Sequence, residues 1–331
     1  MAAVHIQQDD VPPTPSSHQQ TERMSPRAMH YYLTEGLEGV ERKGYRDIRT
    51  FKQAVDSRVE MVRSGKVDEC PTTPYLFFCP VTQKQLANIE RARRDRYKTL
   101  RFLYLNEPQT LIVKIFPGQV HELVVDEFVF TLRKEIEAKG QGEKICSMRS
   151  STFKGLECSK QADGALRPVV ARPDVYGWPS VVFECGVTES PRRLACDARW
   201  WFHNSKGAVK MVIIFFVSAS TKTVTIEIWE RARMENASVT QGNDGDGDEV
   251  DLPVVKETTT INAKNVSSTL TFRFKAIFLR APRKKRGEGD YTLTEGDLRD
   301  YYDRVWSDVM DTSSESEEGK PILVMACLSS S

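Results

Sequence analysis

The strongest hydrophobic pattern of the chain lies between residues 181 and 229. Three apolar runs rich in β-branched residues, at 181–184, 209–217 and 224–229, indicate buried strands. Between the first two runs, residues 191–204 place apolar side chains at helical spacing, and Ser190 and Pro191 are residues that typically begin a helix. A strand, a helix and a second strand in this order predict a crossover connection. The first two runs should therefore be neighbouring central strands, with the helix across one face.

Other segments repeat these two periodicities. Apolar residues at every fourth position, from Val124 to Ile136, predict a long helix over residues 121–139. Residues 268–279 alternate between apolar and polar, which predicts a half-buried strand. Further helices are expected at 48–63, 83–97 and 294–309, and further strands at 110–116 and 144–153. Residues 73–82 should form a short strand or a buried connector.

These elements predict one α/β core with extensions. We expect a disordered tail at 1–28, a mostly helical N-terminal extension at 29–110 and a core at 111–281, in which residues 236–252 form an acidic loop insertion. A basic segment and a C-terminal helix should follow at 282–310, and an acidic tail at 311–331.

Composition narrows the class of protein. The 331 residues are 40% hydrophobic and 28% charged, with a net charge of +1, so any surface for nucleic acid must be local. The seven cysteines form no C-x-x-C pair and the five histidines do not cluster, which indicates neither a zinc site nor a disulfide framework. The N-terminus has no apolar signal core, and the longest apolar run is too short to span a bilayer. The cytosol or the nucleus is the expected compartment, with no membrane partner.

Three acidic residues are candidates for a site. Asp163 precedes the run ALRP, and Glu184 ends the run SVVFE 21 residues later. This interval is long enough for a strand, a proline-containing loop and the next strand, so neighbouring strands can bring the two carboxylates together. The third, Glu122 at the start of the predicted helix over 121–139, is a candidate only because of the family resemblance described next.

Residues 111–229 resemble the PD-(D/E)XK nuclease-like (restriction-endonuclease-like) superfamily. The chain is most similar to a fungal group with the pattern ADxxxxP, PSxVxExGxxES and then DARWW. The matching residues are Asp163, Pro168, Pro179, Ser180, Glu184, Gly186, Glu189, Ser190, Leu194, Asp197, Ala198, Arg199, Trp200 and Trp201. The resemblance implies a restriction-endonuclease-like α/β core, in which helices flank a central mixed β-sheet.

The resemblance also implies a chemistry. Hydrolysis of a phosphodiester bond would use Mg²⁺ or Mn²⁺ to activate water, because hard cations prefer oxygen ligands. The metal would be held by Asp163, Glu184 and the backbone carbonyl of Cys185, with Glu122 as a further carboxylate. DNA, rather than RNA, is the expected substrate.

One position departs from the family pattern. Gly186 stands where the motif has a lysine that orients water and offsets negative charge. Lys160, Arg192 (or its neighbour Arg193) and Lys210 are the basic residues that could replace it. The alternative is that the carboxylates are vestigial and the chain is a catalytically inactive scaffold or a module that binds nucleic acid or protein.

Two basic segments bear on these alternatives. Residues 83–101 contain seven basic and two acidic residues, and residues 280–286 contain five basic residues. Each can contact phosphates or form a solvated face, and the second can also be a nuclear-import signal. The Asp- and Gly-rich run at 242–248 lacks the closing glutamate of a calcium loop, so we expect an acidic surface loop there.

Overall fold

The computed structural model describes residues 25–63, 74–115, 119–149, 151–187, 189–235 and 249–314. Most of the predicted tails and residues 236–248 of the predicted acidic loop lie outside these ranges. The helices are α1 (Pro26–Thr34), α2 (Ile48–Arg63), α3 (Gln83–Arg96), α4 (Gln119–Ala138), α5 (Pro191–Asn204), α6 (Phe274–Phe278) and α7 (Glu295–Ser314), with short 3₁₀ helices η3 (Gly142–Lys144) and η4 (Lys284–Arg286). Within the described residues, no helix is both long enough and apolar enough to cross a membrane.

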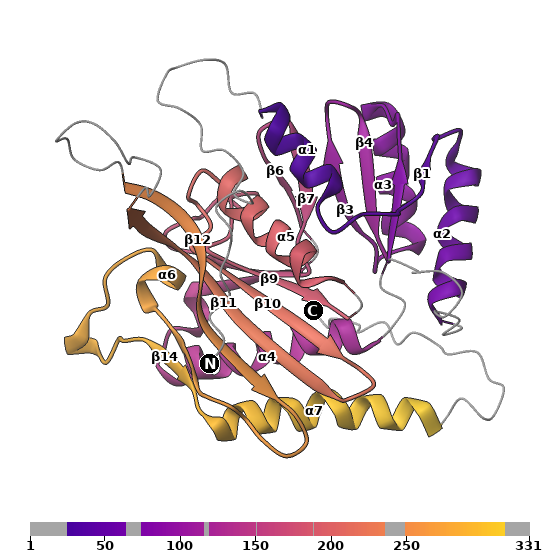
Figure 1. The fold of residues 1–331 in the computed structure, drawn as a ribbon. Coiled ribbons are helices and arrows are strands. Elements are labelled where there is room, and N and C mark those ends of the chain that lie inside the picture. The colour runs from indigo at the N-terminus through magenta and orange to yellow at the C-terminus, as the bar shows by residue number, and fades with distance from the viewer. Residues whose placement is uncertain are drawn as a thin grey trace, which may run out of the picture.

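Two mixed sheets organise the chain (Figure 1). Sheet A has the order β1-β2-β4-β3-β7-β6, made of β1 (Arg42–Lys43), β2 (Tyr75–Phe78), β3 (Arg101–Leu105), β4 (Thr110–Lys114), β6 (Thr152–Lys154) and β7 (Cys158–Gln161). Sheet B has the order β12-β11-β10-β9-β8-β5, made of β5 (Ile145–Arg149), β8 (Gly164–Pro168), β9 (Val181–Gly186), β10 (Met211–Ser218), β11 (Thr223–Glu235) and β12 (Glu249–Ile261). A small pair, β13 (Leu270–Phe272) and β14 (Tyr291–Leu293), completes the strands of the described residues. The chain thus has the predicted α/β fold, with mixed sheets flanked by helices.

The predicted crossover unit is confirmed. Strands β9 and β10 are parallel neighbours, and α5 joins them. The helix begins where its sequence predicts, because the Ser190 side chain accepts a hydrogen bond from the Arg193 N–H and Pro191 occupies the first turn. Its stripe of apolar residues, Leu194, Ala198, Trp201 and Phe202, is fully buried.

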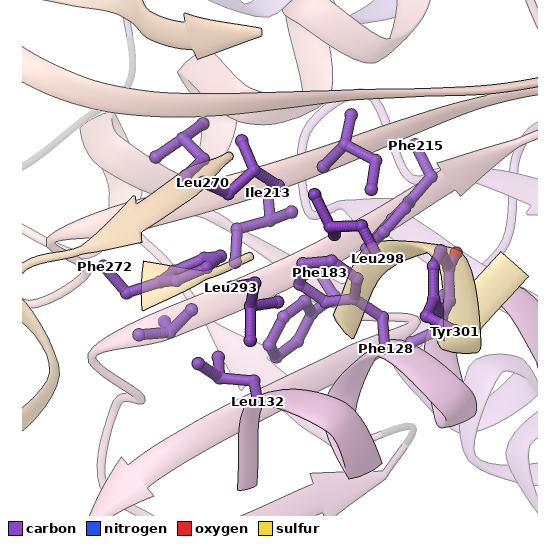
Figure 2. Close-up of a cluster of buried hydrophobic side chains, with 14 of the residues drawn as sticks. Phe128, Leu132, Phe183, Ile213, Phe215, Leu270, Phe272, Leu293, Leu298 and Tyr301 are labelled. Atoms are coloured by element: carbon purple, nitrogen blue, oxygen red, sulfur yellow. The ribbon is translucent and has the colours of Figure 1, made fainter. Parts of the chain in front are cut away.

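The main apolar core lies between sheet B and the helices α4 and α7. Phe128 of α4 is at its centre, with ring centroids 4.9 Å from Phe215, 5.4 Å from Tyr301, 6.0 Å from Phe272 and 6.3 Å from Phe183 (Figure 2). The stripe that the sequence predicts on this helix therefore faces the sheet.

Helix α5 lies between the two sheets. Its apolar side chains form one cluster with residues from β2, β3 and β4 of sheet A and from β9 and β10 of sheet B. The other face of sheet A packs against α2 and α3. This layering brings the loops and strand ends of sheet A onto the face of sheet B that carries Glu184.

Three sequence-based boundaries differ from the structure. The limit predicted between residues 110 and 111 falls inside the antiparallel β3–β4 pair, so the N-terminal segment shares a sheet with the core segment. Residues 144–153 were expected to form one strand, but they supply β5 to sheet B and β6 to sheet A. The strand predicted over 268–279 is wrong beyond Phe272, because the alternating apolar residues continue into the short helix α6.

Candidate functional site

The register of sheet B places Asp163 beside Glu184. Strands β8 and β9 are antiparallel with Gly164 opposite Phe183, so the residues one step outward, Asp163 and Glu184, face each other across the pair. The Cys185 N–H donates a hydrogen bond of 2.9 Å to Asp163 Oδ2. Asp163 thus lies immediately before β8, and Glu184 lies within the buried strand β9.

Three basic side chains surround the carboxylate of Asp163. Arg101 Nε lies 3.2 Å from Oδ1, while Lys114 Nζ lies 3.6 Å and His121 Nε2 3.2 Å from Oδ2. Burial alone would raise the pKa of this carboxyl, but the charges of Lys114, His121 and Arg101 hold the pKa well below its usual range. Asp163 is therefore a compensated carboxylate.

Glu184 is held by two donors on one oxygen. Lys160 Nζ and Trp201 Nε1 each lie 2.6 Å from Glu184 Oε1. Burial raises the pKa of Glu184 to about 7, with a further increase from Asp163, while the Lys160 charge opposes the shift. The side chain is 1% exposed, so this carboxylate does not face solvent.

Lys114, at the end of β4, reaches the position of the expected metal. Its Nζ donates a hydrogen bond of 2.7 Å to the Cys185 carbonyl oxygen and lies 2.9 Å from Glu189 Oε1. The other oxygen of Glu189 accepts a hydrogen bond from the Val187 N–H, which fixes the carboxylate. Burial would lower the pKa of Lys114, but Asp163 and Glu189 outweigh burial and raise the pKa well above its usual value.

A further ion pair extends the site into α5. Arg193 Nη2 lies 3.3 Å from Asp197 Oδ1, and that oxygen is also 3.5 Å from Lys160 Nζ. Arg193 also donates to the backbone carbonyl of Tyr32, which ties α1 to the site.

These contacts form a buried network with balanced charge. Within the part of the chain that the structure describes, four carboxylates pair with four lysine or arginine side chains, all no more than 9% exposed, and the buried His121 adds a further contact to Asp163. The pairs are Arg101 with Asp163, Lys114 with Glu189, Lys160 with Glu184, and Arg193 with Asp197. Sheet A supplies the basic members of the first three pairs. We call this set the four-pair network.

The remaining predicted residues lie at its rim or away from it. The Glu122 side chain is 46% exposed, with Oε1 3.6 Å from Arg101 Nη2, so it lies at the rim. Arg192 points to solvent and pairs with Glu35, the residue that follows α1. Lys210 is exposed and precedes β10, whereas Glu184 pairs with Ile214, about 13 Å further along the strand. The structure therefore brings Lys160, and neither Arg192 nor Lys210, to Glu184.

Position 186 has little room for the motif lysine. A Cβ atom built on Gly186 would lie 2.6 Å from Leu194 Cδ1 and 3.1 Å from Glu189 Oε2. A larger residue here would force the side chains of Leu194 and Glu189 to shift, so the packing of α5 against the end of β9 favours glycine.

The space around the carboxylates is small. A small cavity of about 20 Å³, bordered by Lys114, Lys160 and Glu184, has room for about one water molecule. An outer pocket of about 200 Å³ opens beside Asp163 and is lined by Lys98, Arg101, His121 and Glu122, among others. Asp163 thus borders the larger, outer pocket, while Glu184 borders the small cavity.

The donor set does not fit a Mg²⁺ or Mn²⁺ ion as it stands. The Cys185 carbonyl bonds the Lys114 ammonium, Asp163 Oδ2 accepts from a backbone N–H, and Glu184 Oε1 accepts from two donors. Over the described ranges, no group of three or more His, Cys, Asp or Glu side chains is arranged to hold a metal ion. A dication would have to displace Lys114, because two positive charges cannot share these oxygens without strong repulsion.

Several members of the network were not identified from the sequence. Lys114 is the one charged residue in the predicted strand TLIVKIF, and a lysine at the end of a buried strand is the available signal. Arg193 was predicted only as an alternative to Arg192 for replacing the motif lysine, and its long side chain turns inward and pairs with Asp197. For Glu189, the sequence offered only its place in the family pattern.

Comparisons with known proteins give one distant structural likeness. No protein-family model matches the chain, and no curated protein matches it. Among solved structures, the chain is similar to a protein from Anabaena variabilis ATCC 29413 described as a "putative nuclease belonging to DUF820". The TM-score is 0.34 with 10% sequence identity, over 61% of this chain and 90% of that chain. A likeness at this level carries no weight for function.

Proposed function

We propose that this protein is a non-catalytic module with a nuclease-like fold, which acts by binding nucleic acid. The observation that carries the proposal is the charge balance of the four-pair network. In a metal-dependent nuclease, carboxylates need a dication for compensation and an open path for the phosphate. Here the compensation comes from side chains of the same chain.

Two further observations support the absence of hydrolysis. Glu184 is enclosed by Lys160 and Trp201, so a phosphate group could not approach it without moving both side chains. The tight packing around Gly186 also opposes a lysine at the motif position.

The exposed basic turn supports nucleic acid as the ligand. Arg283, Lys284, Lys285 and Arg286 are exposed around the 3₁₀ helix η4. The turn is held by Glu288, whose carboxylate accepts hydrogen bonds from the Arg280 guanidinium and from the Arg283 N–H. An ordered turn that clusters four like charges on the surface favours a polyanion as partner.

A metal-dependent nuclease is the second candidate. It is favoured by the contact between Lys160 and Glu184, because Lys160 is one of the residues that could replace the motif lysine. It is also favoured by the outer pocket beside Asp163, which would give a metal or a phosphate a way to that carboxylate.

A hydrolysis assay separates the two candidates. Wild-type protein and its Asp163→Asn variant are incubated with mixed DNA and RNA substrates in Mg²⁺ and in Mn²⁺. The proposal predicts equal, background cleavage by the two proteins. Cleavage by the wild type that Asp163→Asn removes would establish the nuclease instead.

Binding is tested through its salt dependence. Replacing Arg283, Lys284, Lys285 and Arg286 with glutamine should weaken DNA binding and reduce the magnitude of the slope of log K against log salt concentration by up to about 3.6, since each phosphate contact contributes about 0.9. The matched control replaces four exposed residues on or beside α3, namely Arg91, Arg94, Arg96 and Lys98, and so removes the same charge. Equal losses in both variants, or no DNA binding by the wild type at 50 mM salt, would contradict the assignment of the turn.

A further inference from the structure

We infer that the ammonium group of Lys114 permanently occupies the place of a divalent cation, and that removing this side chain creates a divalent-cation site. The ligands of the new site would be Asp163, Glu189 and the backbone carbonyl of Cys185. The inference deepens the proposed non-catalytic function and rests on it.

The first support is the set of oxygens around the ammonium group. Lys114 Nζ lies 2.7 Å from the Cys185 carbonyl oxygen, 2.9 Å from Glu189 Oε1 and 3.6 Å from Asp163 Oδ2. One neutral carbonyl and two carboxylates are the ligand types that hard divalent cations prefer. The ammonium thus occupies a site already built from metal-binding oxygens.

The second support is the rigidity of these oxygens. Asp163 is fixed by the Cys185 N–H and by Arg101, and Glu189 is fixed by the Val187 N–H. Both carboxylate side chains are 1% exposed. Loss of Lys114 would leave the carboxylates of Asp163 and Glu189 close together with one positive charge fewer beside them. A bound cation would restore that charge.

The size of the site selects the ion used as a probe. Ca²⁺–oxygen distances are about 2.3–2.6 Å, whereas Mg²⁺ requires about 2.0–2.1 Å in a near-ideal octahedron. Oxygens that now surround an ammonium need to move less for Ca²⁺ than for Mg²⁺. The volume vacated by the lysine, together with the adjacent cavity of about 20 Å³, gives room for water ligands.

The test measures Ca²⁺ and Mn²⁺ binding by the full chain carrying Lys114→Ala. Calorimetry and the electron paramagnetic resonance signal of free Mn²⁺ should show one new site, at least ~100-fold tighter than any binding by the wild type, because the repulsion of the ammonium is gone. Adding Asp163→Asn to the variant should abolish the site. The matched control is Lys160→Ala, which removes another buried lysine but leaves Lys114 in place, and it should gain no site.

Each outcome decides the inference. A Lys114→Ala protein that binds neither ion, or a Lys160→Ala protein that binds them equally well, overturns it. Wild-type protein that binds Mn²⁺ at a site lost in Asp163→Asn also overturns it, and this measurement does not depend on the folding of the lysine variant. If Lys114→Ala does not fold in sodium chloride, recovery of the fold in Ca²⁺ supports the inference and failure to recover contradicts it. Hydrolysis by the wild type would defeat the proposed function, whereas a variant without metal affinity would defeat the inference alone.

Discussion

Replacing Lys160 with methionine tests whether the four-pair network acts as one electrostatic unit. Lys160 Nζ lies 2.6 Å from Glu184 Oε1 and 3.5 Å from Asp197 Oδ1, and its side chain is 6% exposed. Methionine keeps the apolar stem but removes the charge that both carboxylates share. Breaking one buried ion pair by removing a partner costs roughly 3–5 kcal/mol of unfolding free energy. Because two carboxylates lose the same cation, we expect a cost of about 4 kcal/mol at pH 8, where Glu184 is ionised.

A double variant measures the coupling. Lys160→Met with Glu184→Gln restores the charge balance, and glutamine still offers an oxygen to the Trp201 N–H. We therefore expect the double variant to be more stable than the sum of the single effects by roughly 2–3 kcal/mol. The assay is equilibrium unfolding in guanidinium chloride, followed by circular dichroism and tryptophan fluorescence with linear extrapolation.

The matched control for this cycle is Arg192→Met. It removes the exposed ion pair with Glu35 and should cost less than about 1 kcal/mol. If Lys160→Met is as mild as this control, or if the two mutations at the buried pair are additive, the network does not act as a unit.

Three further predictions follow from the structure. Burial raises the pKa of Glu184 from its usual value of 4.5 to about 7. Between these two pH values the native state binds more protons than the unfolded state, so the contribution of Glu184 to stability falls as pH rises through that window. The wild type should therefore lose about 3 kcal/mol relative to Glu184→Gln between pH 4.5 and 8, at 1.36 kcal/mol per pKa unit, and parallel stability curves for the two proteins would contradict this. Phe128→Ala, in the ring cluster of Figure 2, should cost roughly 3–5 kcal/mol of unfolding free energy. Its control is Phe130→Ala on the same helix, where the side chain is 55% exposed and the cost should be less than about 1 kcal/mol. Equal costs would argue against the core described here. Gly186→Ala should lower the unfolding free energy by roughly 1–3 kcal/mol. Gly186→Lys should not produce Mg²⁺-dependent cleavage of nucleic acid. A lysine variant that is stable and cleaves would show that position 186 can accept the motif residue.

Local signals explain which parts of the fold could be predicted. The β9–α5–β10 unit has a helix cap, a proline in the first turn and two β-branched runs, and each of these acts over a few residues. Residues 268–279 show the limit of this reasoning, because a short alternating pattern also fits a brief strand followed by one helical turn. The β3–β4 pair could not be joined to the core from sequence, since sheet order depends on contacts between distant segments.

The same limit applies more strongly to the site. Asp163 and Glu184 could be found because their strands are neighbours and their spacing fits one connection. The basic groups around Asp163 come from further away: Arg101 is 62 residues from Asp163, and Lys114 is 49 residues from it. Such contacts depend on how sheet A packs against sheet B, and no local periodicity encodes that packing.

The prediction of a metal ion at Asp163 and Glu184 started from a correct physical argument. Like charges that are buried together require a compensating cation, and Asp163 beside Glu184 is such a case. The premise does not specify the source of that cation. A bound ion stabilises the fold only in proportion to its free concentration, whereas the ammonium of Lys114 is always present, so the network is complete at any metal concentration. A chain that carries the acidic residues of a nuclease motif without its lysine should therefore be searched for a second signal, a lone lysine or arginine within an apolar strand. Lys114 in TLIVKIF and Arg101 in RFLYL are of this kind, and their positions distinguish a structural network from a metal centre better than the carboxylates do.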